Sequence, residues 1–152
     1  AIPKSWIRRI YHGPRNSRDV AISRLVRDGL LVRKIVSGNK VLQITPLGRH
    51  HLSHSNRKHL IRSTKKWDKR WRVVMFDIKE PRRSVRDALR RELQAVGFVK
   101  IQHSVWAYPY PCEDFIALLK ADLHVGKDIL YLVVEEMEND YLLKKHFLLL
   151  TD

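Results

Sequence analysis

The chain has almost no cysteine and no long apolar segment, and both absences limit what the protein can be. Its 152 residues include one cysteine, Cys112, so no disulfide can form within the chain and a reducing compartment is predicted. No apolar run approaches the roughly 18 residues of a membrane helix, and no secretion signal is visible. We therefore predict a soluble, cytoplasmic protein that does not bind membranes. The first residue is Ala1 rather than Met, which indicates a fragment or a processed chain.

Acidic residues are also scarce. The chain has 16 Asp and Glu against 30 Lys and Arg, which gives a formal net charge of +14. Such an excess is typical of a surface that meets phosphates, although a solvated basic surface or a basic scaffold would share it. The 44% apolar content is enough for packed cores, and the length fits one ordinary domain or two small ones. We predict two.

Residues 71–78 form the stretch around which the second half of the chain is organised. Bulky side chains alternate on both sides, with Trp71, Val73 and Met75 on one and Val74, Phe76 and Ile78 on the other. This pattern predicts a central strand that is covered on both faces. A helix follows, with Pro81 at its first position, an apolar stripe from Val85 to Val96, and Gly97 as its left-handed C-terminal residue. Asp77 lies at the junction of strand and helix.

Residues 1–54 have the pattern of a winged helix-turn-helix. A short helix over residues 3–11 and a turn precede a second helix from Ser17 to about Asp28, which Gly29 ends. Its apolar stripe leaves other side chains to point away, as a DNA recognition helix requires. These are Arg18, Ser23, Arg24 and Arg27.

Two alternating strands follow, over residues 30–36 and 41–45, around a turn with Gly and Asn. They predict a basic hairpin, the wing, whose Arg33, Lys34 and Lys40 are available for the DNA backbone. A helix pair with a hairpin that only packs is the alternative. Such a domain normally has another helix ahead of these two, so we expect the domain to be incomplete or to borrow packing from a partner chain.

Thr45 and Pro46 open a third helix that carries His50, His51 and His54. Adjacent histidines diverge on a helix and no acidic or cysteine ligand lies beside them, which favours a solvated basic face over a zinc site. Residues 55–66 are basic and poor in apolar side chains, and they are predicted to link two domains.

Residues 67–152 predict a ferredoxin-like βαββαβ domain, so that the fold class is α+β overall. Further strands are expected over residues 98–102, 104–108 and 129–134, with a helix over residues 112–123. Such a sheet leaves one face uncovered by its two helices, and we expect this face to meet a second copy in a two-fold homodimer. Residues 135–152 fit either a short helix or an extra strand.

Several short motifs resemble the PaaX-type transcriptional regulators, the phenylacetate repressor family. In the second half they are Trp67-Asp68-x-x-Trp71-Arg72-Val73-Val74, Phe76-Asp77-Ile78, Pro81-Arg82-Arg83, Arg86-Asp87-Ala88-Leu89-Arg90, Leu93-x-x-x-Gly97-Phe98, Gln102-x-Ser104-Val105-Trp106 and Pro109-Tyr110-Pro111-Cys112. In the first half they are Ser23-Arg24-Leu25-Val26-Arg27-Asp28-Gly29-Leu30 and Leu42-x-Ile44-Thr45-Pro46-Leu47-Gly48-Arg49. The resemblance covers nearly the whole chain.

The family's central domain is similar to the small CRISPR-associated nuclease of spacer acquisition. That similarity implies that Asp77 of two subunits could hold a divalent metal, Mg or Mn, between them. The long C-terminal helical region of full-length PaaX regulators has no counterpart here, so an acyl-CoA effector is not implied and any effector stays unknown.

Asp77 could bind a metal ion, or it could have a purely structural role. A hard cation takes one or two carboxylates with water and substrate phosphate, so a dimer could complete a site. Asp77 could instead accept from the amides of the next helix or pair with Arg82 or Arg83. Cys112 is expected to be a buried packing residue, and Trp67, Trp71 and Trp106 core or interface residues.

The helix after Asp77 is coated with arginines that could extend a phosphate track beyond the winged helix. They include Arg82, Arg83, Arg86 and Arg90.

The favoured hypothesis is a DNA-binding transcriptional regulator, a repressor that dimerises through its ferredoxin-like domain and needs no cofactor. The alternative is a metal-dependent endonuclease or spacer-acquisition component that uses Asp77. A basic scaffold without sequence preference is a third hypothesis.

Overall fold

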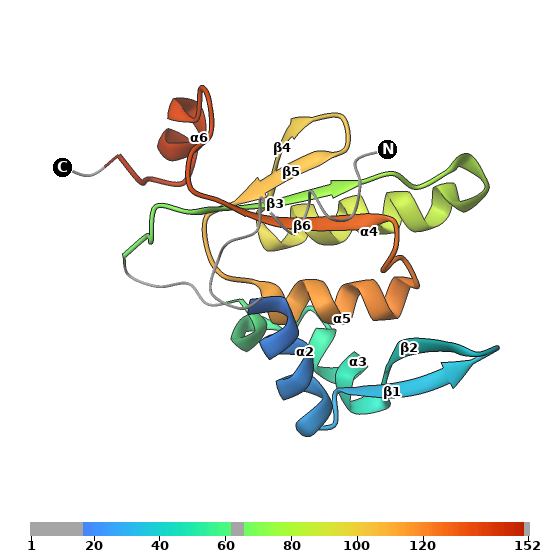
Figure 1. Ribbon diagram of the computed structural model, residues 1–152. Helices are drawn as coiled ribbons and strands as arrows, with labels where there is room; N and C mark the ends of the chain where they lie inside the picture. The colour runs from blue at the N-terminus through green and yellow to red at the C-terminus, as the bar shows by residue number, and fades with distance from the viewer. Residues whose placement is uncertain (1–16, 62–65, 151–152) are drawn as a thin grey trace.

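The computed structural model describes residues 17–61 and 66–150 and shows a mixed α+β protein with two antiparallel sheets (Figure 1). The class predicted from sequence, α+β, is therefore confirmed. The helix predicted over residues 3–11 lies outside the described residues. None of the helices in the described ranges is long and apolar enough to cross a membrane.

The first sheet is a hairpin flanked by two helices. Helix α2 (Ser17–Arg27) leads through Gly29, at φ 80°, to strands β1 (Leu31–Val36) and β2 (Asn39–Ile44), and helix α3 (Pro46–Leu52) follows. The turn is formed by Ser37 and Gly38, both with positive φ, which suits the twist of a two-residue hairpin. It lies one residue earlier than the predicted Gly-Asn turn, because Asn39 already pairs with Val36.

Thr45 and Gly48 fasten α3 to the start of the hairpin. The Thr45 hydroxyl donates to the carbonyl of Gly29 over 2.6 Å and accepts from the Gly48 amide over 3.0 Å as a helix cap. A Cβ on Gly48 would lie 2.2 Å from the Leu30 carbonyl oxygen, so this close approach requires glycine.

The second sheet has the order β4-β5-β3-β6, with all neighbours antiparallel. Its strands are β3 (Trp71–Phe76), β4 (Val99–Gln102), β5 (Val105–Tyr108) and β6 (Ile129–Val134). Strand β3 is central, as predicted. Strands β3 and β4 run parallel with β5 between them, which is the split arrangement expected for the predicted βαββαβ order.

Helices α4 (Arg83–Val96) and α5 (Glu113–Leu123) lie on one face of this sheet (Figure 1). The predicted helix start at Pro81 is corrected, because Pro81 belongs to a separate 3-10 turn, η2 (Glu80–Arg82). Gly97 ends α4 at φ 112°, as expected.

A single core crosses the predicted domain boundary. Leu25 of α2 and Leu52 of α3 belong to the same buried cluster as Phe115 and Leu119 of α5. The segment predicted as a basic linker contains a 3-10 turn, η1 (Lys58–Leu60), whose Leu60 is buried. The first half of the chain therefore packs directly on α5, and its division from the second half stays a prediction.

The opposite face of the sheet is partly covered by α6 (Tyr141–His146) (Figure 1). The tail thus forms a helix rather than an extra strand. Leu143 of α6 and Phe147 pack with Trp71 and Val73 of β3. Met75, at the other end of the same strand face, is 40% exposed. The prediction that both faces of β3 are covered therefore holds for the Trp71 end and is wrong for the Met75 end.

Candidate nucleic-acid interface

Of the four α2 residues predicted to contact DNA, three are exposed and Arg24 is half-buried. Its apolar stripe packs on α5 through buried Ala21 and Leu25. Ser23 and Arg27 are exposed on the other side, and Arg27 forms a 3.0 Å ion pair with its exposed neighbour Asp28. A surface pair of this kind is weak and leaves the guanidinium accessible.

The other two members of the set lie beside α5. Arg24 is half-buried and forms an ion pair with Asp114 in the first turn of α5. Arg18 is exposed and acts electrostatically on Lys120, a buried residue of α5. Burial, and to a smaller extent the nearby Arg18, lower the pKa of Lys120 to about 8. The prediction that all four side chains point away from the packed side is therefore wrong for Arg24, because α5 brings a carboxylate to it.

The hairpin carries exposed cations that no acid neutralises within the described residues. Arg33, Lys34 and Lys40 are exposed and have no hydrogen bond or ion pair to any residue in 17–61 or 66–150. Ile35 and Val36, near the tip, are 73% and 55% exposed. Figure 1 shows the hairpin projecting from the body of the molecule, which makes its basic side chains accessible to an extended ligand.

The predicted phosphate track on α4 is largely neutralised by neighbouring acids. Arg82 pairs with Asp128 over 3.1 Å and Arg86 with Glu80 over 3.1 Å. Asp87 lies between the other two, 4.0 Å from Arg83 and 3.6 Å from Arg90. Arg83 is 72% exposed and is the member of the set best placed to meet a phosphate.

Asp77 is exposed just beyond the C-terminal end of β3. Its amide donates to the carbonyl of Asp128 over 3.0 Å, but within the described residues its carboxylate has no hydrogen bond or ion pair. Pairing with Arg82 or Arg83, the alternative weighed from sequence, is absent in these ranges because those arginines bind other acids. No group of three or more His, Cys, Asp or Glu suited to a metal occurs in residues 17–61 and 66–150. The described part of one chain therefore offers no set of three such ligands around Asp77.

The histidines of α3 and of the segment after it contact one another and α4. His51 Nδ1 lies 2.8 Å from His59 Nε2, and burial followed by the nearby His59 and His50 lowers the pKa of His51. His54 lies 3.2 Å from Glu92 of α4. Glu92 also binds the buried Arg57, so this acid fastens the predicted linker to the sheet unit.

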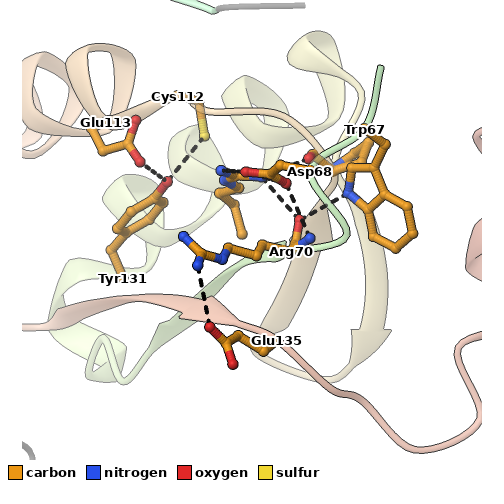
Figure 2. Close-up of polar contacts among 9 residues, drawn as sticks. Trp67, Asp68, Arg70, Cys112, Glu113, Tyr131 and Glu135 are labelled. Atoms are coloured by element: carbon orange, nitrogen blue, oxygen red, sulfur yellow. Dashed lines mark hydrogen bonds and ion pairs between the residues drawn. The ribbon is translucent and has the colours of Figure 1, made fainter. Parts of the chain in front are cut away.

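A buried polar cluster lies where β3 begins and α5 starts (Figure 2). Arg72, almost fully buried, donates to both carboxylate oxygens of Asp68, over 2.8 and 2.6 Å, and to the Pro109 carbonyl over 2.8 Å. Figure 2 also shows Arg70 reaching the exposed Glu135. The cluster ties β3 to the chain between β5 and α5, which is a structural role.

Cys112 belongs to the same region. Its thiol is buried and lies 3.9 Å from the Tyr131 hydroxyl, which donates to Glu113 over 3.1 Å (Figure 2). Burial raises the pKa of Cys112, so the thiol is unreactive. The packing role predicted for this residue is confirmed.

Two residues that matter here escaped sequence reasoning. Asp114 was predictable only as an acid that suits a helix start, and its contact with Arg24 joins residues 90 positions apart. Arg72 was visible only as part of a motif.

Comparison with known proteins supports the resemblance found in the sequence. The family model of the PaaX protein central Cas2-like domain matches residues 64–142, just over half of the chain. No curated protein matches the chain. The matched residues contain the complete four-stranded sheet, the helices α4 and α5, and the Arg72 cluster. The chain belongs to the PaaX family.

Proposed function

We propose that the protein is a DNA-binding transcriptional regulator, a repressor whose first half is a winged helix-turn-helix. The supporting observation is the projecting hairpin with Arg33, Lys34 and Lys40, which are exposed and have no acidic partner in the described residues. In this proposal the hairpin is the wing on the DNA backbone. Ser23 and Arg27 of α2 face the major groove, where Arg27 is suited to a guanine edge.

The distribution of charge along the chain supports this assignment. Residues 1–65 contain 15 Lys and Arg against two acids, whereas residues 66–152 contain 15 against 14. Nearly all of the excess positive charge thus lies in the half that carries α2 and the hairpin. A polyanion is attracted to that half first.

The test is binding of the full chain to duplex DNA over a range of salt concentrations. A sequence selected from random duplexes should bind at least about 10³-fold more tightly than unselected DNA. The logarithm of affinity should fall linearly with the logarithm of salt concentration. A ratio near one would favour a basic scaffold, and no binding at low salt would refute DNA binding.

We further propose that the protein acts as a homodimer through the part of the sheet face that α6 leaves uncovered. This strip includes the exposed Met75 and the half-buried Val105 and Leu130, which lie beside it in register. A copy seated there would bury apolar side chains that now meet solvent. Met75→Glu should give monomers in sedimentation velocity. Leu142→Glu on α6, which changes a 73% exposed leucine, should leave the assembly intact.

A metal-dependent endonuclease is the second candidate, because the exposed Asp77 carboxylate has no partner in the described residues. Two copies would supply two carboxylates, which suits Mg or Mn completed by water and phosphate oxygens. Cleavage of DNA or RNA with Mg or Mn that disappears in Asp77→Asn would support it. Activity that persists in this variant would point to a contaminant.

A further inference from the structure

Helix α5 presents two carboxylates to arginines of the first half. Asp114 pairs with Arg24 of α2, and Asp122 lies 3.7 Å from Arg49 of α3. The first pair is the more enclosed, with side chains 31% exposed for Arg24 and 16% for Asp114. The second is 60% and 36% exposed and is a weak surface contact.

The two partners of the enclosed pair differ in freedom to move. Asp114 has a short side chain that is 16% exposed and precedes the buried Phe115 and Ile116 of α5, which anchor its backbone. Arg24 has a long side chain on the flank of α2, one turn before the exposed Arg27. The long Arg24 side chain has more rotatable bonds than the short side chain of Asp114, so the guanidinium has the longer reach toward a ligand on the Arg27 side.

A carboxylate and a phosphate offer a guanidinium the same kind of charged, bidentate acceptor. Arg24 cannot donate fully to both. We propose that Asp114 competes with DNA phosphate for Arg24, so that α5 of the sheet unit limits the affinity of α2 for DNA. This inference rests on the proposed function, and it assigns Asp114 an inhibitory role in that function.

The experiment is a double-mutant cycle on the full chain, with a duplex of fixed sequence at low salt. Asp114→Asn, which keeps the size of the side chain, should tighten binding by about threefold to tenfold. The salt dependence should steepen by about one phosphate contact. In the Arg24→Ala background the same replacement should have no effect. Glu138→Gln, which removes an exposed charge just before α6, is the matched control and should change nothing.

The outcomes separate this inference from the proposed function. If the wild type does not bind DNA, the proposed function fails. If the wild type binds but Asp114→Asn binds equally or less tightly, only the competition is refuted. If Asp114→Asn tightened DNA binding equally with Arg24 and with Ala at position 24, the competition would also be refuted. The gain in affinity would then come from the loss of a negative charge and not from release of Arg24.

A second measurement covers the case in which Asp114→Asn unfolds at the assay temperature. In the wild type, the NMR signal of the Arg24 guanidinium, assigned by its loss in Arg24→Lys, should shift when the duplex is added. An unchanged signal at saturation would overturn the proposal.

Discussion

The two halves of the chain use equal numbers of basic residues in different ways. Residues 1–65 have 15 Lys and Arg with two acids, and residues 66–152 have 15 with 14. On the hairpin, Arg33 and Lys34 have no acidic partner in the described part of the chain. On α4 and around β3, by contrast, Arg72, Arg82 and Arg86 each bind an acid. The hairpin of the first half thus keeps its cations available for a partner, whereas these arginines of the second half are paired with acids of their own unit.

Removing a structural cation should have the largest effect. Arg72→Ala leaves the Pro109 carbonyl without its buried donor and opens space in the polar cluster, so the free energy of unfolding should fall by about 3 to 5 kcal/mol. Urea denaturation measures this. Arg70→Ala, which breaks an exposed pair with Glu135, is the control and should cost less than about 1 kcal/mol. Equal losses would contradict the structural role of Arg72.

Removing the hairpin cations should chiefly weaken DNA binding. The triple variant Arg33→Ala, Lys34→Ala, Lys40→Ala should lose about tenfold to a hundredfold in affinity at low salt, because up to three phosphate contacts disappear. Its thermal midpoint should stay within a few degrees of the wild type.

The matched control removes three exposed cations of the second half that belong to no predicted binding set, Lys79, Arg91 and Lys127. If this variant loses as much affinity in the same titration, the two halves do not differ in the way proposed.

The buried lysine of α5 predicts a pH dependence of stability. Its folded-state pKa of about 8 lies below the ordinary value of 10.5, so the unfolded chain binds more protons between these pH values. The free energy of unfolding should therefore rise as pH increases from about 8 to 10.5. Lys120→Met should be about 2 kcal/mol more stable at pH 7 and should lack this rise. Urea denaturation of both proteins at several pH values measures this. If the free energy of unfolding depended on pH in the same way for both, burial of the charged Lys120 would not be destabilising.

The smallest effect is expected at the exposed contact between α3 and α5. Asp122→Asn removes the partner of Arg49 at 3.7 Å, and stability should change by less than about 0.5 kcal/mol. A calorimetric shift of many degrees would mean that this pair, rather than the shared apolar core, joins the two halves.

Local sequence patterns predicted most of the fold. Alternating side chains found β3, the spacing from Val85 to Val96 found α4, and Gly97 marked its end because glycine accepts positive φ without strain. The hairpin was also predicted, from two alternating segments around a turn. These features depend on residues close in the chain, where periodicity carries the information.

Contacts between distant residues were not predictable. Arg24 was assigned to a solvent face because α2 was considered by itself, and only the tertiary packing of α5 places Asp114 against it. The arginines of η2 and α4 were predicted as a possible phosphate track, but the sequence does not tell which acids pair with which of them. The segment after β6 is rich in apolar residues, but its pattern fitted a helix and a strand equally, so it did not reveal that α6 packs on the sheet.

The position of α6 on the sheet limits which surface two molecules could use to associate. Because that helix shields the Trp71 end of the central strand, only the opposite end is open to a neighbour. In the proposed homodimer, two molecules would meet through the Met75 end of β3, close in sequence to Asp77, and α6 would lie outside the contact. The position of α6, a short helix near the C-terminus, would thereby determine whether the Asp77 carboxylates of two molecules can come together.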